Sequence, residues 1–233
     1  MEKEQKGYRF TAFSSPVIIR ERPATPLPFP LQETVDALWQ QALQRRGEGS
    51  LMFDGRVYAL AELSSTEVVL EQRRYREFFA ARTDPSLSRA VASLGVTGML
   101  TCPEGLVIGR RGASVALYPG LWEVAPSGTL DSTVPRAVLI RECREELLLE
   151  ESEIRCADHP VGIMCADGIY DFVYRIQTDI SVRDLKMRLS AKTPEYSDIS
   201  VIALSDLMTF PYDAFIPYSA AVIRDVFGPE MAS

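Results

Sequence analysis

The segment PRAVLIRECREELLL, residues 135–149, constrains the fold most, because its apolar and charged residues recur at the spacing of an α-helix. Pro135 suits the first turn of a helix, where its missing N–H costs nothing, and Ser132 or Thr133 is the expected N-cap. At about 100° per residue, apolar side chains gather on one side of this helix, namely Ala137, Ile140, Cys143 and Leu147. The sequence therefore predicts a helix that packs one face on a core and turns its charges elsewhere.

Three carboxylates share another face of the predicted helix, those of Glu142, Glu145 and Glu146. Their negative charges repel one another unless a cation lies among them. Oxygen ligands at this spacing suit Mg²⁺ or Mn²⁺, which also take the phosphate oxygens of a substrate as ligands. The alternative is an ordinary solvated acidic face, in which Arg141 and Glu145 form an ion pair one turn apart.

The composition is that of a globular protein, because 46% of the 233 residues are hydrophobic, which is enough for one large domain or a domain with an added subdomain. The formal net charge of −7 argues against broad contact with nucleic acid or an anionic membrane, since both repel an acidic protein. A ligand that carries phosphate then needs a local Arg, Lys or metal ion. No apolar segment follows the charged start of the chain, and no stretch approaches about 18 apolar residues, so we expect a cytoplasmic protein.

Cysteine and histidine usage argues against a zinc site and a disulfide framework. The four cysteines, Cys102, Cys143, Cys156 and Cys165, form no C-x-x-C pair, and His159 is the only histidine. We expect the cysteines to be small buried hydrophobic residues.

Strands and helices interleave without a regular βαβ period, which favours an α/β (α+β) protein with a mixed sheet between helices over a parallel doubly wound sheet. In the first part we expect strands at both ends of residues 8–20, a helix over 31–46, a hairpin over 56–63 and 67–70, and helices over 73–81 and 85–94. In the second part we expect a hairpin over 96–102 and 106–110, a loop over 118–131, the charged helix, strands within 154–165 and over 170–177 and 199–204, and a last helix over 214–227. The sequence pattern changes near residue 94, which predicts an N-terminal α+β extension (1–94) and a main domain (95–233).

The charged helix carries a family resemblance. Residues 141–146, RECREE, resemble the R-E-U-x-E-E core of the Nudix box, whose full pattern is G-x5-E-x7-R-E-U-x-E-E-x-G-U with U a bulky aliphatic residue. Upstream, residues 120–128, GLWEVAPSG, are similar to the W-E-hydrophobic-P-G-G strand and loop that precede the box. The resemblance implies the Nudix α/β/α sandwich over roughly residues 95–233 and substrates built as a nucleoside diphosphate linked to a moiety X.

The same resemblance implies roles for individual residues. Glu142 and Glu146 would be the principal metal ligands, and Glu145 an additional ligand or a carboxylate that holds water. Arg141 would orient the helix carboxylates, and Gly128 would offer a backbone carbonyl to the metal.

Other site residues are less closely tied to the motif. Glu195 lies where many family members keep an extra acidic residue, so it is the expected general base, with Asp198 as its rival and a loop carboxylate without a role as the alternative. Arg110 and Arg111 end a strand that leads toward the site and are candidates for phosphate contact. A solvated turn is the alternative for both arginines.

The chain also departs from the family pattern. Ser127 replaces the first glycine of the usual pair, Thr133 falls at the early glutamate, and Leu148 replaces the closing glycine. The loop before the helix is one residue shorter than is typical, and Asp131 compensates for the missing glutamate if this shift brings it into place.

The N-terminal part is similar to that of Nudix enzymes that cleave UDP-glucose and UDP-galactose to UMP and the sugar 1-phosphate. The similar segments are residues 39–43, Leu51–Leu60 and Tyr75–Phe79. Tyr75, Phe78 and Phe79 suit either a packed core or a platform on which a base stacks.

Together these features predict a metal-dependent pyrophosphohydrolase, acting on the phosphoric anhydride bond of a nucleoside diphosphate linked to X, for which a nucleotide sugar such as UDP-glucose is the best guess. The expected cofactor is Mg²⁺ or Mn²⁺, and the partner is this small molecule rather than nucleic acid or a membrane. A non-catalytic Nudix-fold sensor of nucleotides or nucleotide sugars is the alternative, and a nucleoside triphosphatase is a third. The N-terminal hairpin could pair with a second copy, which leaves a homodimer open.

Overall fold

The structure is a computed structural model that describes residues 7–46, 53–113, 115, 118–166, 168–189 and 195–231. Leu51, the first residue of the middle N-terminal resemblance, lies outside these ranges. Within them, no helix is long and apolar enough to cross a membrane.

The described residues form twelve strands of one mixed sheet together with five α-helices. The first part of the chain contains β1 (Arg9–Ala12), β2 (Ile18–Arg22), α1 (Phe29–Arg46), β3 (Arg56–Leu63), β4 (Glu67–Arg74) and α2 (Tyr75–Thr83). The second part contains β5 (Ser93–Cys102), β6 (Gly105–Arg111), β7 (Trp122–Val124), β8 (Ser127–Thr129), α3 (Pro135–Leu147), β9 (Ile154–Cys156), β10 (Gly162–Ala166), β11 (Ile169–Thr178), α4 (Val182–Leu189), β12 (Tyr196–Ile202) and α5 (Pro217–Met231).

The main path of the sheet runs β1-β10-β11-β5-β3-β4-β2. Strands β11 and β5 are parallel, as are β2 and β4, whereas β10 pairs antiparallel with β11 and β3 with β4. Strands β6, β7 and β12 form a branch in which β6 pairs with both β7 and β12. The predicted mixed sheet is therefore confirmed.

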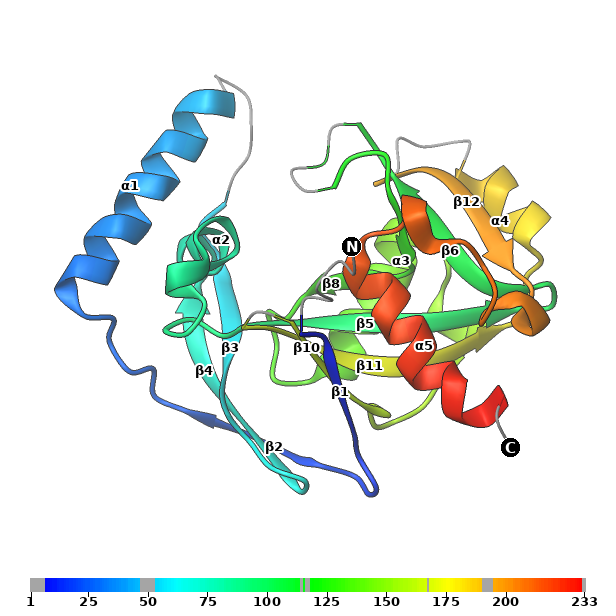
Figure 1. The fold of residues 1–233 in the computed structure, drawn as a ribbon, viewed down its shortest axis with the longest axis horizontal. Helices are drawn as coiled ribbons and strands as arrows, with labels where there is room; N and C mark the ends of the chain where they lie inside the picture. Colours follow the sequence, from blue (N-terminus) through cyan, green and yellow to red (C-terminus); the bar gives the residue numbers. More distant parts are fainter. Residues whose placement is uncertain are drawn as a thin grey trace, which may run out of the picture.

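Helices cover both faces of β5 and β11 (Figure 1). Alternate residues of β5 point to opposite sides: Val96 and Leu100 join one core cluster with α3 and α4, whereas Met99 joins a second cluster with α5. The predicted α/β/α arrangement follows from this alternation, since each face of the sheet is apolar and each is covered.

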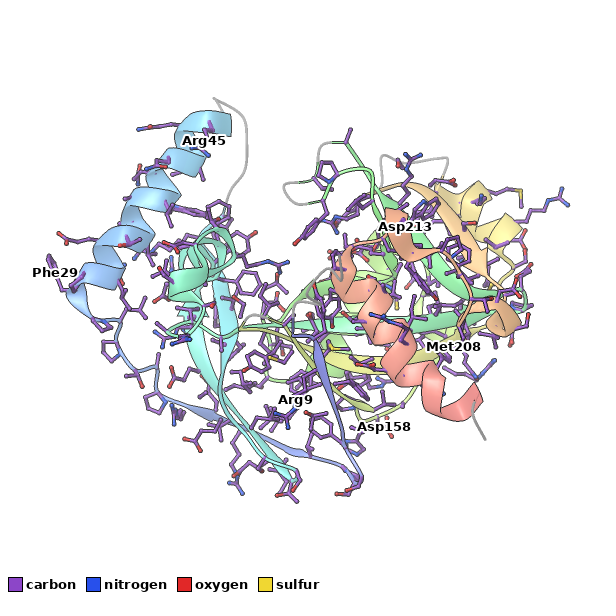
Figure 2. The ribbon with its side chains drawn as sticks, viewed as in Figure 1. Arg9, Phe29, Arg45, Asp158, Met208 and Asp213 are labelled. Atoms are coloured by element: carbon purple, nitrogen blue, oxygen red, sulfur yellow. The ribbon has the colours of Figure 1, made fainter. Side chains whose placement is uncertain are left out.

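The N-terminal part continues the same sheet. β1 pairs with β10, β3 pairs with β5 between Ala59 and Ser93, and Val17 and Leu70 belong to the core cluster that also contains Val96. Helix α1 lies at the outer edge of this part, where Phe29 points into solvent (Figure 2). The division near residue 94 stays a prediction.

The predicted helix over 85–94 is wrong, since only a 3-10 turn at Pro85–Leu87 forms and β5 already begins at Ser93. Pairing of β5 with β11 over most of its length outweighs the local preference of this segment. Helix α2 begins at Tyr75 rather than at Arg73, because Arg73 and Arg74 extend β4. Helix α4 was not predicted. The predicted loop over 118–131 is wrong in part, since it contains the short strands β7 and β8, of which the family resemblance had indicated only the first.

Candidate metal centre

Helix α3 presents its glutamates in different environments. Its core face consists of Val138, Leu139, Cys143 and Leu147, all buried, whereas Ala137, expected on that face, is exposed. The predicted N-cap is also wrong: Val134 occupies that position without a side-chain cap, and the Ser132 hydroxyl instead accepts a hydrogen bond from the Val134 N–H. The ends of the helix are therefore set by packing more than by capping.

Glu146 is the most enclosed carboxylate of the helix, with only 4% of the residue exposed. Its Oε2 accepts hydrogen bonds from the backbone N–H of Ser127 and from the Tyr196 hydroxyl, both at 3.0 Å. Burial raises the pKa of Glu146 well above its ordinary value, and the nearby charges of Glu195 and Glu142 add to this rise.

Glu142 lies directly against Gly128 of β8. A Cβ on Gly128 would come within 2.5 Å of the Glu142 Cδ, so only glycine leaves room for this carboxylate. Burial raises the pKa of Glu142, although the hydrogen bond from Arg141 Nη2 at 3.0 Å opposes the rise. The carboxylate of Glu142 thus packs directly against the backbone of Gly128.

Arg141 lies among the carboxylates, as the family resemblance implies. Its Nη1 donates to both oxygens of Asp131, at 3.0 and 2.9 Å, and its Nε lies 3.8 Å from Glu145. Asp131 therefore fixes Arg141, and it acts on Glu142 of α3 through the arginine. Glu145 is 61% exposed, so its carboxylate faces solvent at the rim of the site.

A second acidic group consists of Glu123 from β7 and Glu195, which directly precedes β12. Glu123 is buried and forms an ion pair with Arg111, and burial raises the pKa of Glu123 although Arg111 opposes the rise. Arg111 also lies 3.4 Å from Glu195, which is 41% exposed. Arg111 is thus engaged by two carboxylates, one of them that of the expected general base, Glu195.

Two residues of this group, Glu123 and Tyr196, were not among the predicted site residues. A signal for Glu123 is present in the sequence, since a charged residue lies between Trp122 and Val124 in the segment that resembles the family strand. Tyr196 carries no comparable signal.

The two remaining candidates lie farther out on the surface. Arg110 is exposed and donates from Nε to the carbonyl of Gly120 at 3.1 Å. Asp198 is exposed and forms an ion pair with Lys186 at 3.3 Å.

The donor set fits a hard divalent cation. The backbone of Gly128 lies beside Glu142. Glu146 supplies a buried carboxylate and Glu142 a partly buried one, and oxygen donors of this kind suit Mg²⁺ or Mn²⁺. Their negative charge is only partly balanced by Arg141, so a cation would relieve the cost of burying it. In the described part of the chain, no three His, Cys, Asp or Glu side chains already converge on one point. Glu145 in particular stands apart.

Fold and site define a mixed α/β protein with an acidic helix packed on a glycine-containing strand.

No protein-family model and no curated protein matches the chain. The MutT protein from Methanosarcina mazei Go1 is 14% identical, with a TM-score of 0.41, over 60% of this chain and 96% of that one. DR0079 from Deinococcus radiodurans is 23% identical, with a TM-score of 0.41, over 73% of this chain and 98% of that one.

A further solved structure is the NUDIX domain of NrtR from Shewanella oneidensis, complexed with ADP ribose. It is 15% identical, with a TM-score of 0.39, over 60% of this chain and 88% of that one. At these identities and TM-scores, the activity has to be argued from the residues of the site.

Proposed function

We propose that this chain is a metal-dependent pyrophosphohydrolase of the Nudix type, a hydrolase that cleaves the diphosphate of a nucleoside diphosphate linked to X. The observation that carries the proposal is the pair Glu142 and Glu146, one turn apart on α3 and both enclosed beside β8, with Gly128 leaving room for the first. A surface acidic face without a ligand would leave both carboxylates in water.

Glu142, Glu146 and the carbonyl of Gly128 would hold Mg²⁺ or Mn²⁺. When bound, such an ion neutralises the charge of the diphosphate and lowers the pKa of a bound water. Arg141, fixed by Asp131, keeps the Glu142 carboxylate turned toward Gly128.

Glu195 is the residue that we expect to accept the proton of the attacking water. Its carboxylate is 41% exposed and lies 3.4 Å from Arg111, so it is open to water and held in place by a neighbouring cation. Asp198 remains the rival, but its contact is with Lys186 on α4. Arg110 is the better candidate for phosphate contact, because Arg111 already pairs with Glu123 and Glu195.

A nucleotide sugar such as UDP-glucose is the substrate that we propose, on the strength of the N-terminal resemblance. The aromatic residues of that region favour packing over base stacking: Trp39 makes edge contacts with Tyr75 and Phe79, and Tyr75 stacks on Phe78. They therefore add no support for a uracil platform.

A non-catalytic sensor of the same ligands is the second candidate. It is favoured by the enclosure of Glu146, whose Oε2 is already bonded to Ser127 and Tyr196, and by Thr133 at the position of the early glutamate.

Incubation with Mg²⁺ and a panel of UDP-sugars, ADP-ribose, dinucleoside polyphosphates and nucleoside triphosphates, followed by anion-exchange chromatography, separates these functions. We expect a nucleoside monophosphate and a phosphorylated X from the wild type. Glu146→Gln should lower this turnover by at least about 100-fold, because loss of a supporting residue alone costs about 10–100-fold. Binding without cleavage would identify a sensor, pyrophosphate release from triphosphates would identify a triphosphatase, and full activity of Glu146→Gln with an unchanged circular dichroism spectrum would end the proposal.

A further inference from the structure

Tyr196, the first residue of β12, reaches α3 from the far side of the site. Its side chain is buried, with 1% of the residue exposed, and the ring lies over Gly109 of β6. A Cβ on Gly109 would come within 2.5 Å of that ring, so the glycine provides the space in which the ring lies. The direction of the hydroxyl is therefore determined by packing.

The hydroxyl of Tyr196 meets a carboxylate that already has one donor. Within the described residues, the Glu146 carboxylate accepts two hydrogen bonds, both on Oε2, one from the Ser127 N–H and one from the Tyr196 hydroxyl. Two donors on one oxygen limit rotation of the carboxylate and leave Oε1 for another ligand.

The opposite side of Tyr196 is also built from charged groups. Glu123 lies near the hydroxyl, and Arg111 balances the charge of Glu123. Tyr196 thus lies between the buried carboxylates of Glu123 and Glu146. Of these two carboxylates, Arg111 forms an ion pair with that of Glu123. With an apolar side chain at position 196, the Ser127 N–H would be the one remaining hydrogen-bond donor to Glu146 among the described residues.

We propose that Tyr196 is a positioning residue that orients the Glu146 carboxylate for a divalent cation, an inference that rests on the proposed function. Groups that hydrogen-bond to a metal ligand fix its orientation, and their loss typically weakens metal binding by about 10–100-fold. Tyr196 has no direct role in the reaction under this proposal.

The test is titration of the free protein with Mn²⁺, without substrate, followed by electron paramagnetic resonance. Tyr196→Phe should bind Mn²⁺ about 10–100-fold more weakly than the wild type. Tyr58→Phe is the matched control, because Tyr58 is also buried and its hydroxyl lies 3.3 Å from a carboxylate oxygen, that of Glu21 in β2. The control should retain the affinity of the wild type.

Thermal unfolding with and without Mn²⁺ confirms that each variant is folded and provides a second readout. Mn²⁺ should raise the unfolding temperature of Tyr196→Phe less than that of the wild type, and excess Mg²⁺ should restore its turnover. Unchanged affinity in Tyr196→Phe, or equal loss in both variants, would overturn the inference and leave the proposed function standing. A wild type that binds no Mn²⁺ would overturn both.

Discussion

Asp171 is a carboxyl group outside the proposed metal centre whose titration affects the stability of the fold. It lies on β11 opposite Gly95 of β5, and a Cβ on Gly95 would overlap its Oδ1. Burial raises the pKa of Asp171 to about 7, although Arg82 and a hydrogen bond from Tyr218 oppose the rise. The folded protein therefore retains this proton at pH values where the unfolded chain has lost it.

The sign of the pH dependence follows from this difference. Between about pH 4 and pH 7 the folded state binds more protons than the unfolded state, so the contribution of Asp171 to stability is present at low pH and is lost as the pH rises. Asp171→Asn should increase the free energy of unfolding at pH 8 by on the order of 1–3 kcal/mol, with little gain at pH 4. Urea unfolding at both pH values measures this change.

Asp158→Asn is the control, since Asp158 lies exposed at the periphery of the molecule (Figure 2). It should change stability at neither pH by more than about 0.5 kcal/mol. A lower free energy of unfolding in Asp171→Asn at pH 8 would contradict this prediction, because it would mean that the negative charge of Asp171 stabilises the fold.

Gly128 carries a prediction about the carboxylate beside it. Gly128→Ala should displace Glu142, because the new methyl group would lie 2.6 Å from Glu142 Oε1. We expect weaker Mn²⁺ binding with a smaller effect on the free energy of unfolding, because the atoms that must move are the end of the flexible Glu142 side chain. Gly7→Ala is the control, because nothing lies within 4 Å of a Cβ at that position. Wild-type Mn²⁺ affinity in Gly128→Ala would show that Glu142 can move without consequence.

At the scale of elements, α3 could be predicted because its apolar and acidic residues differ in angular position. The three glutamates were predicted to share one face, but Glu146 is buried and Glu145 is largely exposed. On the apolar side, Ala137 is exposed while Val138 and Leu139 are buried. Two neighbouring faces of this helix are apolar. The angular positions of the residues around the helix axis do not by themselves indicate which face packs on the sheet.

The end of α3 shows how a departure from the motif is accommodated. Leu148, at the position of the closing glycine, adopts φ 54° and ψ 36°, the left-handed conformation that usually ends a helix at glycine. Its side chain packs against the main core, which offsets a strain of about 1 kcal/mol. Leu148 therefore ends the helix in the conformation that a glycine would adopt there.

The partners of Glu146 could not be predicted from local sequence. Tyr196 reaches Glu146 because β12 pairs with β6, and Glu123 approaches because β7 pairs with the other edge of β6. The pairing of β12 with β6 joins segments far apart in the chain, and no periodicity within one segment encodes it.

At the scale of the whole molecule, the sheet and one core cluster cross the predicted boundary near residue 94. Tyr58, Val68 and Leu70 belong to the same cluster as Leu139 of α3, and β1 completes the edge of β10. The boundary was predicted from a change in local pattern, and such a change does not indicate which strands pair.

A chain that starts at residue 95 should therefore lose cooperative unfolding or unfold at a much lower temperature than the full chain. The physical reason is that it would expose the edge of β10 and remove Tyr58, Val68 and Leu70 from the core cluster. Circular dichroism during heating measures this, with the full chain as reference. An equal unfolding temperature for both would establish residues 95–233 as an independent domain.

The space above Gly109 links two positions that are far apart in the sequence. Because the Tyr196 ring occupies this space, a larger residue at 109 and an aromatic residue at 196 exclude one another. In related chains, the two positions should accordingly vary together, with a side chain at 109 accompanied by a smaller residue at 196 and by a different donor for the buried glutamate.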